Sequence, residues 1–93
     1  MKELIKQLTE AYGPPGYEDA VRDIIRERVA PHADRIEVDP LGNLHAVRNG
    51  SGDGLTIMLA AHMDEIGLMV PYINERGYAR FSVLGGVHPD TLI

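Results

Sequence analysis

The most apolar stretch of the sequence is Leu55-Thr56-Ile57-Met58-Leu59-Ala60-Ala61, and this stretch decides the expected fold. Gly54 precedes it, and His62-Met63-Asp64-Glu65 follows it with an abrupt change to polar residues. A short run with apolar residues on both faces, bounded in this way, is typical of a strand buried between two layers. The sequence therefore predicts an interior strand over residues 55–61, with the side chains of Ile57 and Leu59 shielded from solvent.

Outward from this strand, the sequence predicts two helices before it and hairpins on both sides of it. Apolar residues recur at helical spacing in two N-terminal segments, as the stripes Leu4-Ile5-Leu8 and Val21-Ile24-Ile25-Val29. Gly13 is expected to end the first helix and Pro31 the second. Alternating patterns and turn residues predict strands over residues 35–38, 44–48, 66–73 and 78–84. The expected fold class is α/β, with two N-terminal helices packed on a mixed β-sheet, because each apolar stripe must cover a sheet face.

Composition and charge are those of an ordinary soluble chain of at most one domain. The 93 residues carry 9 Lys plus Arg against 14 Asp plus Glu, a formal net charge of −5, and 44% of them are apolar. The acidic balance argues against nucleic acid as a partner, because phosphate binding needs a basic face. The absence of cysteine excludes disulfides and thiolate metal sites. No apolar run approaches the roughly 18 residues of a membrane span, and the N-terminus has no secretory apolar region. We therefore expect a cytoplasmic protein with no membrane partner.

The candidate site is the pair His62 and Asp64 at the end of the apolar stretch. Open α/β sheets place ligand sites at the carboxyl ends of their strands. Residues i and i+2 of an extended backbone project to the same side, so Asp64 can accept the second N–H of the His62 imidazole. A carboxylate in that position fixes the tautomer and makes the free nitrogen a better metal ligand. A polar strand end with a local hydrogen bond explains the same pair without a metal.

The other polar residues offer no obvious set of further ligands. Glu65 could be a ligand or a base, but a solvated turn residue explains it as well and is the favoured interpretation. His32, His45 and His88 lack the H-x-x-x-H or H-E-x-x-H spacing and are expected at the surface. A zinc or two-metal centre needs three or four protein ligands for each ion, or shared bridging ones. The residues alone therefore indicate one candidate corner of a metal site.

Four segments of the sequence match the pattern of one peptidase family. They are Gly13-Pro14-Pro15-Gly16-Tyr17-Glu18, Val38-Asp39-Pro40-Leu41-Gly42-Asn43-Leu44, Met58-Leu59-Ala60-Ala61-His62-Met63-Asp64-Glu65-Ile66-Gly67 and Gly85-Gly86-Val87. Through these segments, the chain resembles the N-terminal part of the glutamyl aminopeptidase and deblocking aminopeptidase family over essentially all 93 residues. Members of that family are dinuclear metallopeptidases that form tetrahedral particles, and some carry an endoglucanase or cellulase label.

The resemblance implies an activity, its metals and the roles of two residues. It implies hydrolysis of N-terminal residues from peptides by two divalent ions, zinc or cobalt, that share a water, with a glutamate as general base. It implies that His62 is a metal ligand and that Asp64 belongs with the catalytic residues as the carboxylate that orients it. The remaining ligands and the general base of the family lie outside this chain, so we expect the isolated chain to be inactive.

The resemblance also implies a domain organisation and an assembly. Residues 1–84 would be the N-terminal part of a catalytic domain with the zinc-peptidase (phosphorylase/hydrolase-like) fold. Residues 85–93 would begin an inserted domain, truncated here, that drives the assembly of large homo-oligomers in the family.

Two functions from different classes therefore compete. The first is the N-terminal portion of a metallo-aminopeptidase, and the second is a non-enzymatic module of the same fold that binds a partner chain. A cellulase is a distant third, because the sequence has no carboxylate pair on a shared cleft and only 5% aromatic residues for sugar stacking.

Overall fold

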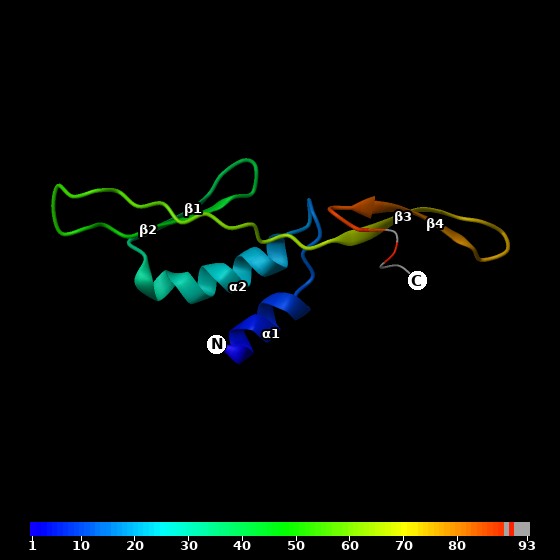
Figure 1. Ribbon diagram of the computed structural model, residues 1–93, viewed down its shortest axis with the longest axis horizontal. Helices are drawn as coiled ribbons and strands as arrows, with labels where there is room; N and C mark the ends of the chain where they lie inside the picture. The colour runs from blue at the N-terminus through cyan, green and yellow to red at the C-terminus, as the bar shows by residue number, and fades with distance from the viewer. Residues whose placement is uncertain (89, 91–93) are drawn as a thin grey trace.

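The computed structural model describes residues 1–88 and residue 90 of the chain, in which two helices precede two hairpins (Figure 1). In chain order, the elements are α1 (Lys2–Glu10), α2 (Asp19–Val29), the 3₁₀ turn η1 (Ala30–His32), β1 (Arg35–Val38), β2 (Leu44–Val47), β3 (Gly67–Ile73) and β4 (Ala79–Leu84). This mixture of helices and strands confirms the expected α/β class. The four strands predicted from alternating patterns are present, each within one residue of its expected limits.

The two helices are in contact with each other, and the segment that joins them approaches α2 closely at Gly13. Arg28 of α2 donates a hydrogen bond to the side-chain oxygen of Gln7 of α1. The expected helix stop at Gly13 is wrong, because α1 ends before Ala11, which is extended with φ −74° and ψ 138°. Gly13 is required instead by packing: a Cβ there would lie 2.5 Å from Cγ2 of Val21. Val21 is buried, with 4% of its surface exposed.

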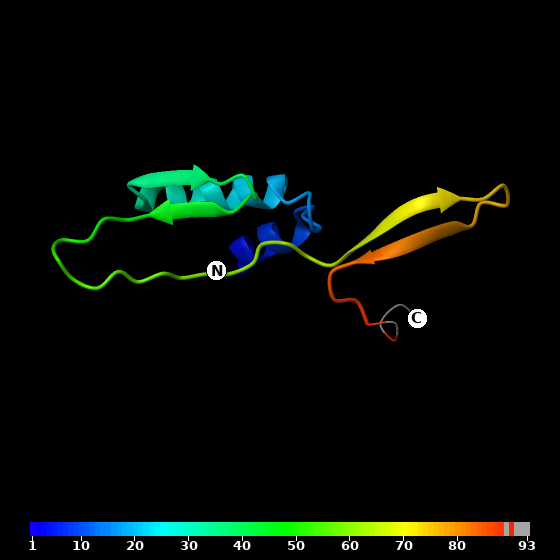
Figure 2. The same cartoon turned by 90° about the horizontal axis from the view of Figure 1, so that it is seen from above.

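The β1–β2 hairpin lies along α2, and its turn is fixed by one carboxylate (Figure 2). Oδ1 of Asp39 accepts hydrogen bonds from the backbone N–H groups of Leu41 and Asn43, both at 2.9 Å. Gly42 supplies the positive φ of 87° that the turn needs. Arg22 of α2 donates from Nη1 to the carbonyl oxygen of Gly42 at 3.2 Å, so the helix also holds the turn in place.

Both hairpins are antiparallel, and they form separate sheets. The registers run from Arg35 opposite Val47 to Val38 opposite Leu44, and from Gly67 opposite Leu84 to Ile73 opposite Ala79. The second register shifts between Met69 and Tyr72, around Pro71, which has no N–H to donate. The expected mixed sheet is wrong, because the strands that the structure describes make two separate two-stranded antiparallel sheets.

Residues 55–61 depart most from expectation, because they form no strand and lie in solvent. Leu55, Ile57 and Leu59 have 97%, 81% and 94% of their surface exposed, so the expected interior strand is wrong for this chain. The physical reason is a lack of neighbours. A buried strand needs hydrogen-bonded partners, and none of the strands described here pairs with residues 55–61. The molecule extends over 65 × 31 × 23 Å, with this open stretch leading from the first hairpin toward the second (Figure 2).

Two other expectations concern the membrane and the domain boundary. No helix within the described part of the chain has the length and apolar character needed to cross a membrane. The expected second domain over residues 85–93 falls partly on residues 89 and 91–93, which lie outside the described residues. The boundary after Leu84, where β4 ends, stays a prediction.

Candidate functional site

The polar residues that follow the open stretch line an open hollow of about 150 Å³ where three segments meet. The segments are Glu18 before α2, residues 41–43 in the β1–β2 turn, and residues 61–64. Two hydrogen bonds hold these segments together. One is the bond from Arg22 to Gly42, and the other runs from the backbone N–H of Glu65 to the carbonyl oxygen of Gly13 at 2.9 Å. The structure therefore brings His62 and Asp64 beside a helix start and a tight turn that are distant in sequence.

His62 and Asp64 are in contact in this hollow. Nδ1 of His62 lies 3.1 Å from Oδ1 of Asp64 and 3.0 Å from the backbone oxygen of the same residue. A carbonyl oxygen only accepts hydrogen bonds, as does an ionised carboxylate, so Nδ1 is the nitrogen that carries the proton. In the neutral imidazole, Nε2 then has a free lone pair, which is the arrangement of a metal-binding histidine oriented by a carboxylate.

The described residues of this chain offer one ligand of a metal site and do not complete the site. His62 offers one nitrogen on a side chain that is 85% exposed. Glu18 lines the same hollow, but its Oε1 accepts a hydrogen bond from the backbone N–H of Gly16 at 2.6 Å. Across residues 1–88 and 90, no three His, Asp or Glu side chains gather closely enough to hold an ion. A complete site therefore needs donors from elsewhere.

Glu65 and the remaining histidines lie at the surface, as expected. Glu65 is exposed, and its backbone N–H rather than its carboxylate makes the contact with Gly13. His32, His45 and His88 are exposed as well. His45 has a partner that the sequence did not suggest, because its Nε2 lies 3.2 Å from Oδ2 of Asp39.

Asp39 carries the clearest electrostatic perturbation, and the sequence indicates no such role for it beyond its place in the segment Val38–Leu44. The side-chain N–H of Asn43 donates to Oδ2 of Asp39 at 2.8 Å, and Nε2 of His45 lies 3.2 Å from the same oxygen. Two backbone N–H groups donate to Oδ1. These donors stabilise the ionised form and hold the pKa of the Asp39 carboxyl well below its usual range. An aspartate followed four residues later by asparagine in a glycine-containing turn is the signal that could have revealed this role. The effect is to stiffen one wall of the hollow.

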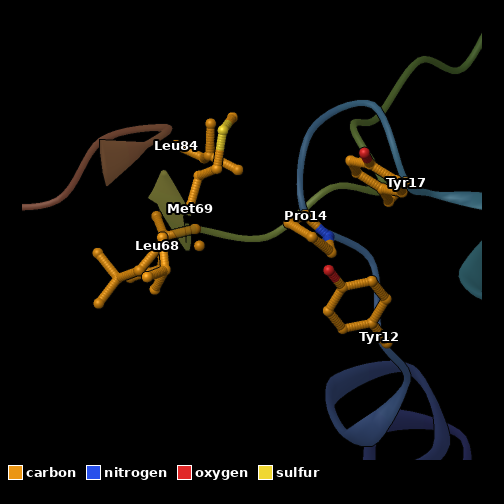
Figure 3. A pocket seen from close by; sticks show the side chains of 9 residues that line it. Tyr12, Pro14, Tyr17, Leu68, Met69 and Leu84 are labelled. Carbon is orange, nitrogen blue, oxygen red and sulfur yellow. The ribbon is translucent and has the colours of Figure 1, made fainter. Parts of the chain in front are cut away.

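A second, larger hollow of about 310 Å³ is apolar and lies beside the first residues of β3. Figure 3 shows the rings of Tyr12 and Tyr17 near Pro14, across from Leu68, Met69 and Leu84. Gly67 permits this arrangement, because a Cβ there would lie 2.9 Å from Cβ of Pro14. No Asp, Glu, Lys, Arg or His lines the hollow, so it offers packing surface rather than acid–base chemistry.

Comparison with known proteins identifies the family. A family model described as M42 glutamyl aminopeptidase matches residues 42–93, more than half of the chain and the part that holds the His62–Asp64 pair. The chain belongs to the M42 family. A second family model, described as AMPT, matches residues 1–25 of this M42 chain. The resemblance inferred from the four sequence segments is thereby confirmed.

Several relatives of this M42 chain are named aminopeptidases. It is 49% identical over 87 residues to a putative aminopeptidase of Acetivibrio thermocellus, which covers 94% of the chain and 26% of that relative. It is 45% identical over 92 residues to lysyl aminopeptidase of Pyrococcus furiosus, covering 98% of the chain and 26% of the relative. The solved structure of aminopeptidase APDkam598 from Desulfurococcus kamchatkensis matches with a TM-score of 0.91 and 44% identity, over 97% of this chain and 25% of that one. The M42 chain thus spans about a quarter of the length of these relatives.

Proposed function

We propose that this M42 chain is the N-terminal portion of a metal-dependent aminopeptidase, in which His62 binds a divalent metal ion and Asp64 orients its imidazole. The observation that carries the proposal is the double contact of His62 Nδ1 with two oxygens of Asp64, at 3.0 and 3.1 Å. This contact leaves Nε2 as the ligating atom. Membership of the M42 family and the names of the relatives support the reaction class.

In this proposal, Asp64 orients the imidazole of His62 and adds a negative charge beside it, and the backbone of Glu65 fixes the position of the segment. A divalent ion, zinc or cobalt in our proposal, would polarise a peptide carbonyl and lower the pKa of a bound water. Asp64 holds the imidazole by Nδ1, and its negative charge makes Nε2 more basic. The hydrogen bond from Glu65 to Gly13 anchors the backbone immediately after Asp64. The other ligands of a two-metal site and the general base would come from outside this chain, as the resemblance implies.

The substrate, the location and the assembly are parts of the same proposal. Peptides are the proposed substrates, because the relatives are named aminopeptidases. The proposed location is the cytoplasm, in keeping with a composition that contains no cysteine. Assembly into large homo-oligomers through a domain that begins near Gly85-Gly86 rests on the family resemblance alone. The second candidate function, a non-enzymatic module that binds a partner chain, is favoured by the exposure of residues 55–61.

The test measures metal content and peptide turnover in an M42 protein of family length that carries this segment. His62→Ala should lose one of the two metal positions and most of the turnover, because a direct ligand is removed. His32→Ala is the control, since His32 is an exposed histidine that does not line the hollow, and it should keep both. Two metals per chain and near-normal turnover in His62→Ala would show that the site is misplaced. A wild-type protein without metal and without turnover would favour the non-enzymatic module.

A further inference from the structure

A small buried junction holds the segment that carries the candidate site. Three residues are buried within residues 1–88 and 90, and they adjoin one another: Gly13, Pro14 and Val21. Chain added around this junction can only increase its burial, so the junction does not depend on what covers the open stretch. We therefore expect the same contacts in a protein of family length.

The site segment is attached to this junction at two points. The backbone N–H of Glu65, directly after the candidate site, donates to the carbonyl oxygen of Gly13 at 2.9 Å. Two residues further along, Gly67 lies so close to Pro14 that a Cβ on Gly67 would be 2.9 Å from Cβ of Pro14. The C-terminal side of the site is thus held in place, and the position of Gly13 determines the position of Glu65.

Gly13 permits this attachment because it has no side chain. A Cβ there would lie 2.5 Å from Cγ2 of Val21, 3.5 Å from Cβ of Val21 and 3.9 Å from the carbonyl oxygen of Met63. Neither Gly13 nor Gly67 has a positive φ, so the constraint is steric contact and not backbone conformation. Carbon atoms in ordinary contact are about 3.5–4.0 Å apart, so an added Cβ on Gly13 would displace it from α2 by about 1 Å.

We propose that Gly13 and Gly67 are positioning residues of the His62–Asp64 site, because they let the backbone that follows Asp64 lie against the buried junction. Neither residue offers a side chain to a metal ion or a peptide, so both act through the backbone of residues 62–66. A functional site must be held to within about 0.5 Å of its productive geometry, and a misplacement of about 1 Å can cost about 100-fold in rate. A shift of about 1 Å at Gly13 is therefore enough to impair the site. This inference rests on the proposed function.

The first experiment measures metal affinity, the cobalt absorption spectrum and peptide turnover in a family-length protein that carries this segment. Gly13→Ala should change the spectrum and lower affinity at one metal position and turnover by at least about tenfold each. The double variant Gly13→Ala/Val21→Ala should recover to within about threefold of wild type, because without Cγ2 the nearest atom of residue 21 is its Cβ at 3.5 Å. Val21→Ala alone removes packing without adding an atom at Gly13, and it should also stay within about threefold.

The outcomes separate a positioning role from a purely structural one. A purely structural role would lower stability to urea and leave the metal affinity and spectrum of the folded protein unchanged. Wild-type affinity and turnover in Gly13→Ala, or a double variant as impaired as Gly13→Ala, would overturn the positioning role. His62→Ala is measured beside them: loss of metal in His62→Ala alone refutes only the positioning role, whereas wild-type metal content in both refutes the proposed function as well.

The second experiment measures hydrogen exchange of the Glu65 amide in the same protein without metal, so it does not depend on activity. In Gly13→Ala this amide should exchange at least about tenfold faster than in wild type, because its acceptor is displaced, and the double variant should restore slow exchange. Gly67→Ala covers the case in which Gly13→Ala does not fold, and it should lower metal affinity by at least about tenfold. Gly52→Ala, with nothing within 4 Å, is its control. Unchanged exchange in Gly13→Ala, or equal affinity in Gly67→Ala and Gly52→Ala, would overturn the proposal.

Discussion

Replacing Asp64 by asparagine should weaken metal binding while leaving the His62 imidazole in its orientation. In the structure, His62 Nδ1 has two acceptors at 3.0 and 3.1 Å, the backbone oxygen and the carboxylate of Asp64. The backbone oxygen is unaffected by the substitution, and the asparagine amide oxygen can accept in place of the carboxylate. The proton therefore stays on Nδ1. What is lost is the negative charge that makes Nε2 more basic.

The structure places the expected magnitude near the lower end of the known range. Partners that orient metal-binding histidines typically contribute about 10–100-fold in metal affinity or activity. Asp64→Asn should fall near tenfold, because the backbone acceptor of the His62 Nδ1–H remains. Asp64→Ala also removes the second acceptor and should approach hundredfold.

The assay measures metal affinity by competition with a chelator, and turnover of an aminoacyl anilide, in a family-length protein carrying this segment. Glu65→Gln removes the same charge from the adjacent, exposed carboxylate and should leave both quantities unchanged. Wild-type affinity and turnover in both Asp64→Asn and Asp64→Ala would refute the reasoning, because the contact between His62 and Asp64 would then be a local hydrogen bond with no role in metal binding. An equal loss in Glu65→Gln would assign the effect to overall charge instead of the contact with His62.

Three further predictions concern activity, acid stability and packing. The 93-residue chain alone should not hydrolyse aminoacyl anilides with zinc or cobalt added, since no general base is identifiable in it; turnover that co-purifies with the chain and disappears in His62→Ala would contradict this. The lowered pKa of Asp39 means that the ionised carboxylate stabilises the folded turn, fully above a pH of about 4 and progressively less below it. An NMR pH titration of the Asn43 amide should show this loss in wild type and not in Asp39→Asn. Gly13→Ala should destabilise the chain by about 1–3 kcal/mol in urea unfolding, because the new Cβ would meet Val21, whereas Gly50→Ala, with nothing within 4 Å, should not.

The parts of the fold that sequence predicted well are those determined by neighbours along the chain. The β1–β2 and β3–β4 hairpins each pair strands joined by a short turn, so the alternating pattern and the turn residues contain the needed information. The contact between His62 and Asp64 spans two residues and follows from the geometry of the backbone alone. Its metal-binding role stays a prediction.

The parts that sequence did not predict depend on distant segments. The role of Gly13 comes from contact with Val21 on the next helix, and no local pattern distinguishes that role from a helix stop. The hollow that joins Glu18 to residues 41–43 and 61–64 forms only once the helix, the turn and the open stretch have come together. The prediction that residues 55–61 are buried was wrong for a related reason. An apolar pattern indicates that a segment is stable when other residues cover it, but it does not identify those residues.

The open stretch and the candidate metal site are adjacent, and this adjacency connects their energetics. Residues 55–61 run directly into His62, so whatever pairs with the stretch also restricts the backbone that carries the imidazole. The other end of the site is already restrained, because Glu65 is hydrogen-bonded to Gly13. An ion that takes its remaining ligands from outside this chain would lose less conformational entropy on binding once the stretch is paired, since fewer residues would remain to be ordered. Covering of residues 55–61, by whichever chain supplies it, should therefore strengthen metal binding at His62.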